Sequence, residues 1–270
     1  MDDVGFTYPG EPTAALTQCS LSAAAGAITW LTGALGAGTS TALLVAAGLA
    51  PRHTGGERVG QVRTLGLDPA ASSAAAVLGG RVALVLSSPA TQLSGIAETV
   101  AQEVAFAPAN LGWPRSRIHE GVARALAALG IAHLAGRDPG TLSGGEMQRT
   151  VIAAMLVLEP ELWLLDEPAS ALDAAGRTLV HDLLRAEAAR GAAVVIASED
   201  TDGLAAVADR LVVFGAGRPV LDGRPELVLR GDPLWDAGAA STTIAALSRA
   251  AGLTAPRPLT VDEGVARWAR

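Results

Sequence analysis

Residues 33–41 read GALGAGTST, a glycine-rich stretch that separates two apolar segments of different character. The run AITWL at residues 27–31 favours a strand, and the run TALLVAA at residues 41–47 favours a helix. A glycine turn between a strand and a helix is the setting of a phosphate-binding loop, because backbone N–H groups at the start of the helix face the turn. The segment therefore predicts a phosphate site at the end of a strand.

The pattern of such a loop is G-x-x-x-x-G-K-[ST], and this stretch lacks the lysine. Gly33 and Gly38 stand at the two glycine positions and Ser40 stands at the hydroxyl position, but Thr39 occupies the lysine position. All 20 basic residues of the chain are arginine, so no lysine stands nearby to replace it. The stretch therefore matches the pattern except at the lysine, the only charged residue of the pattern.

Composition limits the classes of protein to which the chain can belong. Its 270 residues are 50% hydrophobic, which allows a large core in one domain or in one domain with an appendage. A net charge of −7 and an aromatic content of 3% argue against a nucleic-acid-binding surface. The start does not resemble a signal peptide, Cys19 is the single cysteine, and no apolar run approaches a membrane span. These features predict a cytoplasmic protein with no nucleic-acid partner.

Strand-like and helix-like segments alternate along the chain. The expected strands are residues 27–31, 81–86, 162–165, 193–197 and 210–214, and the expected helices follow Ser40 and Ser143 and cover residues 118–129 and 177–190. This alternation predicts an α/β fold with a mostly parallel sheet and helices on both of its faces. Residues 87–140 are rich in helix signals and interrupted by prolines, which indicates an inserted helical subdomain.

A second motif, LSGGEMQR, covers residues 142–149. Ser143 and Glu146 form the pattern of a capping box at the start of a helix, which by itself requires no function. The cap does not explain the two consecutive glycines, Gly144 and Gly145, which leave backbone N–H groups uncovered at the amino end of that helix. The dipole and free donors of such an end favour an anion such as a terminal phosphate.

A third motif, LWLLDEP, covers residues 162–168 and is followed by SALD at residues 170–173. Two adjacent carboxylates directly after four apolar residues are a stronger signal than a single charge at a strand end. Asp166 is a candidate ligand for Mg²⁺, and Glu167 is a candidate to orient or deprotonate an attacking water.

Together these motifs resemble the nucleotide-binding domain of an ABC transporter, over nearly the whole chain. LSGGEMQR, LLDEP and SALD follow the glycine loop in the order and at the spacing of that family. The resemblance implies a P-loop NTPase of ABC type that binds ATP and Mg²⁺, with Ser40 and Asp166 at the metal. It also implies that residues 33–41 form the Walker A loop, that Gly36 and Thr41 contact nucleotide, and that Tyr8 stacks on the adenine.

Within the family, the chain is most similar to energy-coupling factor ATPases of the cobalt and vitamin uptake type. The residues behind this similarity are Gln92 and Leu93, VAFAPANLG at residues 104–112, and PLTVDE at residues 258–263. The similarity implies a peripheral subunit at the cytoplasmic face of the cell membrane. Its implied partners are an integral membrane transporter subunit and a second ABC ATPase subunit.

The same resemblance divides the chain into three parts. Residues 1–86 and 141–215 would form the ATP-binding core, residues 87–140 a helical subdomain that contacts the membrane subunit, and residues 216–270 a C-terminal extension.

Three positions depart from the family pattern where the γ-phosphate would be contacted. Thr39 replaces the Walker A lysine, Ser87 replaces the Q-loop glutamine, and Glu199 replaces the switch histidine. Misalignment cannot explain the first or the third, because the chain has no lysine and no histidine follows His181. For Ser87 the nearby Gln92 leaves that explanation open. Each missing donor weakens phosphate binding and transition-state stabilisation, so we expect the local site to turn over poorly.

ABC nucleotide-binding domains pair head to tail, so that each ATP lies between the Walker A loop of one subunit and the signature of the other. The resemblance therefore implies that Ser143, Gly144, Gly145 and Glu146 complete the ATP site of a partner with an intact Walker A loop. Glu167 would support only residual catalysis in the local site.

Three hypotheses remain open at this stage. The chain is the degenerate half of a heterodimeric ATPase in an energy-coupling factor importer, or a self-sufficient homodimeric ABC ATPase in which arginine or the dimer partner replaces the lysine. In the third hypothesis it is a structural adaptor that binds no nucleotide. The transported substrate would be set by a separate membrane protein.

Overall fold

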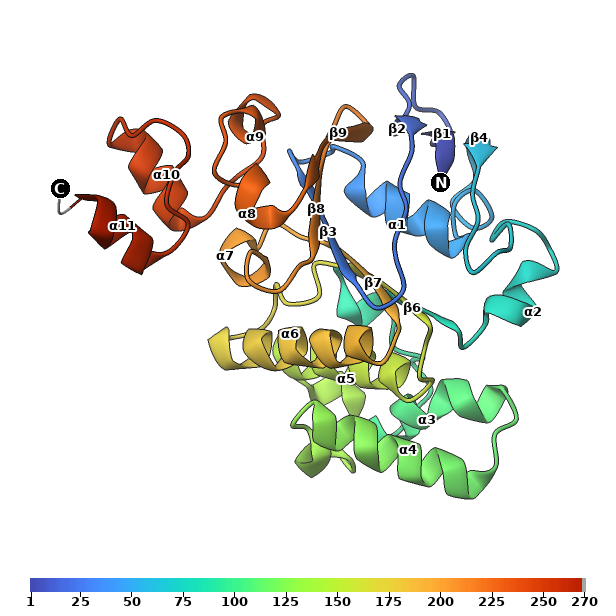
Figure 1. The fold of residues 1–270 in the computed structure, drawn as a ribbon. Helices are drawn as coiled ribbons and strands as arrows, with labels where there is room; N and C mark the ends of the chain where they lie inside the picture. Colours follow the sequence, from blue (N-terminus) through green and yellow to red (C-terminus); the bar gives the residue numbers. More distant parts are fainter. Residues whose placement is uncertain (269–270) are drawn as a thin grey trace.

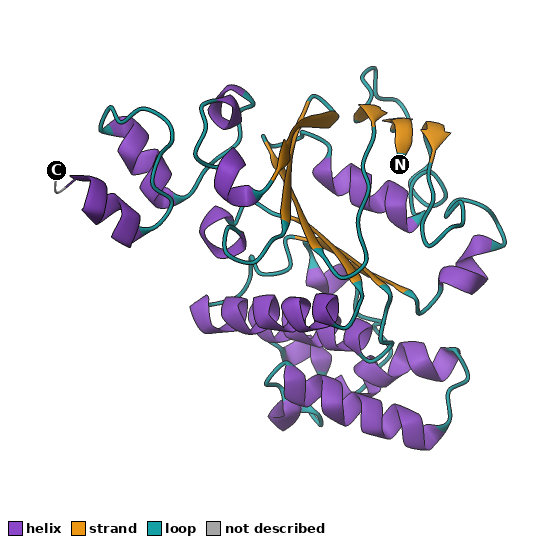
Figure 2. Cartoon of the chain, in the orientation of Figure 1, coloured by secondary structure: helices purple, strands orange, loops and turns teal. Residues whose placement is uncertain are grey.

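The computed structural model describes residues 1–268, and its centre is a six-stranded sheet with the strand order β5-β6-β7-β3-β8-β9 (Figures 1 and 2). Its strands are β3 (Ile28–Gly33), β5 (Val82–Val85), β6 (Leu162–Asp166), β7 (Ala193–Ala197), β8 (Arg210–Gly215) and β9 (Arg218–Gly223). The first five pair in parallel, and β9 pairs antiparallel with β8. The predicted α/β fold with a mostly parallel sheet is confirmed.

Both faces of this sheet are buried, which explains why its strands read as unbroken apolar runs. In β6, Trp163 and Leu165 belong to the core on one face, whereas Leu162 and Leu164 belong to the core on the other face. Successive side chains of a strand point to opposite faces. A parallel sheet that is covered on both sides therefore needs apolar residues at consecutive positions.

Helices cover the two faces of the sheet (Figure 1). Helix α1 (Thr39–Ala47) packs on the face that carries Leu162 and Leu164. Helices α5 (Gly144–Leu156) and α6 (Ala174–Ala189) pack on the face that carries Trp163. The helices expected after Ser40 and after Ser143 are thus present and lie on opposite sides of the sheet.

A second, three-stranded antiparallel sheet covers the α1 side of the molecule, and the sequence patterns did not foresee it. Its strands pair in the order β2-β1-β4 and are β1 (Asp2–Thr7), β2 (Leu16–Cys19) and β4 (Glu57–Gln61). Its inward side chains, which include Phe6 and Leu16, share a core with Leu43 of α1. The short helix α2 (Ala74–Leu78) lies between this sheet and β5 in the sequence.

Residues 87–140 form a helical lobe at the bottom of Figure 1. The lobe consists of α3 (Val100–Asn110), α4 (Arg115–Ala128) and the 3-10 turns η1 (Pro89–Thr91), η2 (Ala132–Leu134) and η3 (Pro139–Thr141). Helix α4 begins at Arg115, earlier than the expected residue 118, directly after the extended Pro114. Helix α5 packs against both α3 and α4. The lobe and the LSGGE helix therefore share one hydrophobic core.

The C-terminal part forms an arm of short helices, on the left of Figure 1. Its helices are α8 (Pro225–Val228), α9 (Pro233–Asp236), α10 (Thr243–Ala250) and α11 (Val261–Trp268). The short helix α7 (Thr201–Leu204) lies between β7 and β8 in the sequence and contacts α6. Ion pairs tie the arm together: Arg257 with Asp232 at 2.7 Å, and Arg230 with Glu263 at 2.7 Å. The last two residues of the proposed extension 216–270 lie outside the described residues.

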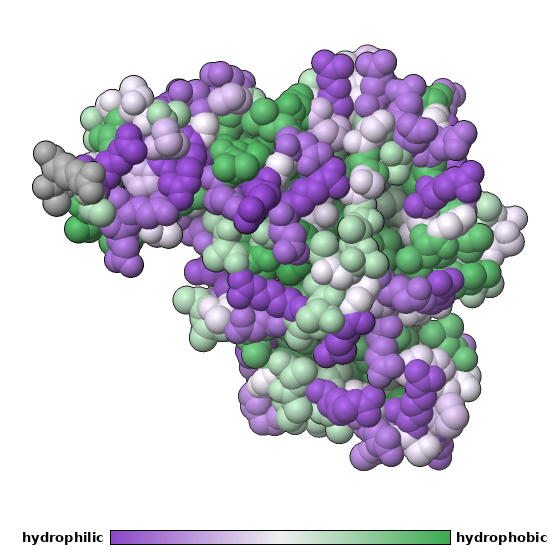
Figure 3. Space-filling view, viewed as in Figure 1, coloured by the Kyte–Doolittle hydropathy of each residue, from purple (hydrophilic) through white to green (hydrophobic). Residues whose placement is uncertain are grey.

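In residues 1–268, no helix combines the length and the apolar character that crossing a membrane requires. On the face shown in Figure 3, hydrophilic and hydrophobic residues are interspersed over the core, the lobe and the arm.

Two buried tryptophans allow a test of one hydrogen bond in this core. Trp30 and Trp163 are both fully buried, but Trp30 Nε1 donates to the Ser198 carbonyl at 2.8 Å, whereas Trp163 Nε1 has no partner within residues 1–268. Replacing Trp30 by Phe leaves a buried carbonyl unpaired, which costs about 1–3 kcal/mol. We therefore expect Trp30→Phe to lower the free energy of unfolding by about that much more than Trp163→Phe in urea titrations. Equal losses in the two variants would contradict the role given to this bond.

Candidate functional site

The carboxyl ends of the parallel strands meet at one edge of the sheet and enclose a pocket. The end of β3 leads into the glycine loop, β6 ends at Asp166, and β7 is followed by Ser198 and Glu199. The pocket has a volume of about 180 Å³. Its lining includes the predicted site residues Gly33, Gly36, Thr39, Ser40, Ser87, Asp166, Glu167 and Glu199.

The two glycines of the loop pattern are both required by close packing. A Cβ added to Gly33 would lie 2.5 Å from the Phe214 carbonyl oxygen, and one on Gly38 would lie 2.6 Å from the Ala15 carbonyl oxygen. Gly38 also has a φ of 103°, which side chains other than glycine rarely adopt. The second sheet, which contains Leu16, therefore fixes the shape of the loop from behind.

The amino end of α1 is open to an anion. Among the described residues, no side chain caps this helix, and its first turn contains no acidic residue. Uncapped N–H groups and the positive end of the helix dipole favour a phosphate at this position. Thr39 and Ser40 lie in that first turn and line the pocket.

Ser40 and Asp166 come together from distant parts of the chain. Ser40 Oγ donates to Asp166 Oδ1 at 3.0 Å. Burial raises the pKa of Asp166, and the bond from Ser40 opposes part of that shift. A hydroxyl and a carboxylate are the hard oxygen ligands that Mg²⁺ prefers. In residues 1–268 no group of three His, Cys, Asp or Glu side chains could hold a metal. This pair would therefore share Mg²⁺ with water and phosphate oxygens.

Glu167 is tied to the segment that follows β7. Its Oε1 accepts from the Glu199 backbone N–H at 2.8 Å and its Oε2 accepts from Ser198 Oγ at 2.9 Å. The backbone N–H of Glu167 donates to the Ala197 carbonyl at 2.8 Å, and its φ is 49°. Burial raises the pKa of Glu167, and the two bonds to its carboxylate oppose that shift. Both carboxylate oxygens thus have partners inside the chain.

Ser198 is a site residue that the sequence patterns missed. It is buried, and besides its bond to Glu167 its Oγ accepts from the Asp200 N–H at 3.1 Å. Asp200 caps α7 and its carboxylate lies 4.0 Å from His181 Nε2. The signal that could have found Ser198 is its place directly after a buried strand, beside Glu199.

The structure separates the roles of Ser87 and Gln92. Gln92 Oε1 accepts from the Leu86 N–H at 2.7 Å, and Gln92 Nε2 donates to the Leu84 carbonyl at 2.9 Å. The Gln92 side chain therefore holds the backbone around the end of β5. Ser87, and not Gln92, lines the pocket.

Three residues predicted to bind nucleotide lie outside the pocket lining, namely Tyr8, Gly38 and Thr41. Tyr8 follows β1, and its hydroxyl lies 3.2 Å from Thr41 Oγ1. Its ring stands edge-on to Phe6, with a centroid distance of 4.9 Å. A base stacked on Tyr8 would lie beyond the phosphate pocket, over the start of α1.

The LSGGE segment also lies outside this pocket and forms the amino end of α5. The capping box is complete: Glu146 N donates to Ser143 Oγ at 3.4 Å, and the Ser143 N–H and Oγ both donate to Glu146 Oε2, at 2.8 and 2.7 Å. Gly144 and Gly145 follow the cap. A Cβ on Gly144 would meet only Ala171 Cβ, at 3.8 Å, whereas one on Gly145 would lie 3.1 Å from the Ala171 carbonyl.

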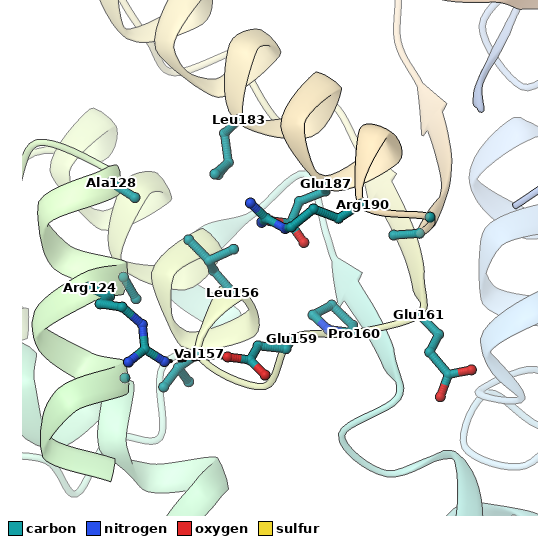
Figure 4. A pocket seen from close by; sticks show the side chains of 14 residues that line it. Arg124, Ala128, Leu156, Val157, Glu159, Pro160, Glu161, Leu183, Glu187 and Arg190 are labelled. Atoms are coloured by element: carbon teal, nitrogen blue, oxygen red, sulfur yellow. Dashed lines mark hydrogen bonds and ion pairs between the residues drawn. The ribbon is translucent and has the colours of Figure 1, made fainter. Parts of the chain in front are cut away.

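A larger cavity, of about 700 Å³, is at the opposite edge of the sheet (Figure 4). It lies between α4, the end of α5 and the end of α6, before the starts of β6 and β7. Its carboxylates are all paired with arginines: Glu159 with Arg124, Glu161 with Arg81, and Glu187 with Arg190. Because each carboxylate of its described lining is paired, this cavity is a weaker candidate for the functional site than the loop pocket.

Comparison with known proteins agrees with the motifs that surround the loop pocket. The family model described as ABC transporter matches residues 16–170. The chain belongs to the ABC transporter ATP-binding family. It is 38% identical to the nickel import ATP-binding protein NikO of Rhodobacter capsulatus over 234 residues, which cover 85% of this chain and 90% of NikO.

Solved ABC structures share the fold of the chain. CbiO1 of Clostridium perfringens, part of the ABC transporter complex CbiONQ, superposes with a TM-score of 0.70 at 28% identity, over 84% of this chain and 88% of CbiO1. The ATP-binding cassette MJ0796, solved as a dimer bound to ADP and Pi, superposes with a TM-score of 0.70 at 22% identity, over 83% of this chain and 97% of MJ0796. At that identity the second likeness shows the fold alone.

The half-buried carboxylate of Glu167 predicts a pH dependence for this ABC protein. Its raised pKa means that the folded state binds the proton more readily than the unfolded state. The stability from this group is fully present below the usual pKa of about 4.3 and is lost as the pH rises through the raised value. We therefore expect Glu167→Gln to raise the thermal midpoint at neutral pH by a few degrees, with magnesium chelated, and to give no gain near pH 4.

The control for this measurement is Glu161→Gln. The side-chain bond from Arg81 lowers the pKa of Glu161, so its charged form stabilises the fold above its usual pKa. Its replacement should leave the neutral-pH midpoint unchanged or lower it. A Glu167→Gln gain that is equal at both pH values would contradict the assignment.

Proposed function

We propose that this ABC transporter ATP-binding subunit serves an importer of the energy-coupling factor type and is the weaker half of a heterodimeric ATPase. One contrast carries the proposal. The capping box at the amino end of the LSGGE helix is complete. The described lining of the local pocket, by contrast, contains three carboxylates and no lysine, arginine or histidine.

The charges of the local pocket oppose phosphate binding. Asp166, Glu167 and Glu199 line it together with uncharged loop residues, and Thr39 supplies a hydroxyl at the lysine position. A lysine at the phosphates contributes a charge-assisted hydrogen bond of about 1.5–3 kcal/mol, which Thr39 cannot supply. The open N–H groups of α1 remain as phosphate donors. Nucleotide binding should therefore be weakened and not abolished.

The residues that remain fit Mg²⁺ together with ATP. Ser40 Oγ and Asp166 Oδ1 lie 3.0 Å apart at the pocket edge and would hold the ion. Bound Mg²⁺ neutralises phosphate charge in phosphoryl transfer. Glu167 faces the same pocket, but its carboxylate accepts bonds from Ser198 and Glu199. Both carboxylate oxygens therefore already have a hydrogen-bond donor from the chain itself.

The signature of the chain is suited to a partner's nucleotide. Gly144 is exposed at the amino end of α5, so its N–H can approach a phosphate without a side chain in between. The MJ0796 cassette was solved as a dimer with ADP and Pi, which supports pairing between cassettes of this fold. We infer that Ser143, Gly144, Gly145 and Glu146 complete the ATP site of a second ATPase subunit with an intact Walker A loop.

The names of similar proteins support the importer assignment. NikO is a nickel import ATP-binding protein, and CbiO1 is part of the complex CbiONQ. We propose an integral membrane subunit as the other partner and the cytoplasmic face of the cell membrane as the location. The helical lobe at residues 87–140 presents the exposed apolar side chains Ile96, Phe106 and Leu111, which fit contact with that subunit.

Two alternatives make different predictions for the same complex. A homodimeric ATPase would depend on Glu167 in every active site, and a structural adaptor would depend on neither Glu167 nor the signature. The uncapped amino end of α1 favours some nucleotide binding over the adaptor.

The first test of the proposal restores the missing charge. Thr39→Lys should tighten Mg-ATP binding by roughly 10–150-fold, the effect of a charge-assisted bond of about 1.5–3 kcal/mol. Calorimetric titration of the purified chain measures it. Thr178→Lys, on the exposed side of α6, adds the same net charge away from the pocket and should change nothing. If Thr39→Lys binds no tighter than the parent, the account of the loop is wrong.

The second test separates the two ATP sites. The chain is tagged in its native host, and the ATPase rate of the purified complex is measured with single variants at matched assembly. Gly144→Glu should abolish hydrolysis, because it adds bulk and negative charge where N–H groups would meet a partner's phosphate. The space around Gly144 accepts a Cβ, so the loss would not come from misfolding. Glu167→Gln should reduce the rate less than twofold.

Equal losses from both variants would mean that the local site is catalytic. A complex that keeps its full rate with Gly144→Glu would favour the adaptor.

A further inference from the structure

Arg137 joins the helical lobe to the capping box of the signature helix. Its Nε donates to Thr141 Oγ1 at 3.0 Å and its Nη2 donates to the Thr141 carbonyl at 2.7 Å. Its Nη1 donates to Glu146 Oε1 at 3.4 Å. The Arg137 backbone is itself fixed, since its carbonyl accepts from the Val100 N–H at the start of α3 at 2.9 Å. The guanidinium thus reaches the signature from an anchored position.

The partner of Arg137 in the signature helix is the carboxylate of Glu146. Its other oxygen, Oε2, accepts from both the N–H and the hydroxyl of Ser143. The backbone bond from Ser143 is the main cause of its lowered pKa, to which the charge of Arg137 also contributes. The carboxylate is therefore ionised at neutral pH and lies in the first turn of α5, beside the two glycines.

A negative charge at this position opposes the proposed role of the signature. The helix dipole and the free N–H groups attract a phosphate, whereas an unpaired carboxylate in the same turn would repel it. Arg137 supplies a positive charge to the Glu146 oxygen that Ser143 leaves free. Arg149 also contributes positive charge near Glu146, but its hydrogen bonds go to the carbonyls of Gly145 and Leu129.

We propose that Arg137 is a positioning residue for the partner's ATP site, where it neutralises Glu146 and fixes the start of the signature helix. The inference rests on the proposed function of the signature. Arg137 touches no nucleotide in this account and acts through Glu146. Only arginine combines the three contacts, because its planar group donates in several directions at once.

The test uses the tagged complex from the native host, with Mg-ATP as the probe. Arg137→Met removes the charge and keeps most of the side-chain length, and we expect kcat/KM to fall roughly fivefold, the effect of about 1 kcal/mol. Adding Glu146→Gln should return kcat/KM to within about twofold of the parent, because glutamine preserves the capping box without the charge. Glu146→Gln is measured alone in the same assay as the reference for the double variant.

This rescue separates neutralisation from a mechanical role. If Arg137 only held Thr141 in place, removing the charge of Glu146 would not restore the rate. A double variant as slow as Arg137→Met, or an Arg137→Met complex at the parent rate, would overturn the proposal.

Two controls complete the design. Arg124→Met breaks a comparable arginine–glutamate pair, to Glu159 at 3.3 Å, at the far cavity and should leave kcat/KM unchanged. Gly144→Glu in the same preparation tests the proposed function itself. If Gly144→Glu abolishes hydrolysis and Arg137→Met has no effect, only the inference about Arg137 fails. If Gly144→Glu has no effect, the proposed function fails and the inference with it.

Discussion

The parallel pairing of β3 between β7 and β8 is the constraint on which the site depends. Parallel strands end at the same edge of a sheet, so the glycine loop after β3 meets the acidic end of β6 and the segment after β7. The bond between Ser40 and Asp166 joins residues 126 positions apart in the sequence. The second sheet fixes the other side, because the Ala15 carbonyl leaves room for nothing larger than glycine at Gly38.

The side chains around the amino ends of α1 and α5, the two ends proposed to meet phosphate, differ in charge. At α1 the described residues around the open helix end provide carboxylates and hydroxyls without a basic side chain. At α5 the one carboxylate of the first turn, Glu146, faces Arg137 and two donors of Ser143. The amino end of each helix carries the positive end of its dipole, but a basic side chain balances the neighbouring carboxylate only at α5. This difference in local charge is the physical basis for the proposal that the two helix ends differ in phosphate binding.

The patterns that predicted the fold were those that depend on local sequence. Consecutive apolar residues in β6 and β7 reflect burial on both faces, and the capping box of Ser143 and Glu146 depends on positions three apart. The antiparallel sheet escaped prediction because β2 has four residues and β4 is largely exposed, so neither shows a clear alternation. Side-chain contacts between neighbouring strands could not be predicted from these local patterns either. Ser198 reaches Glu167 only because β6 and β7 are neighbours, an order that alternation of strands and helices does not specify.

Glu167 makes several structural contacts in a pocket whose described lining contains no basic residue. Its carboxylate accepts two bonds from the segment after β7, and its backbone N–H is bonded to the last residue of that strand. These contacts hold Glu167 at a φ of 49°, a conformation that costs a residue with a side chain about 1–2 kcal/mol. Ser198 and Asp200 continue the chain of bonds to the cap of α7. Glu167 thus takes part in the local structure of this edge of the sheet, so its presence alone does not indicate turnover.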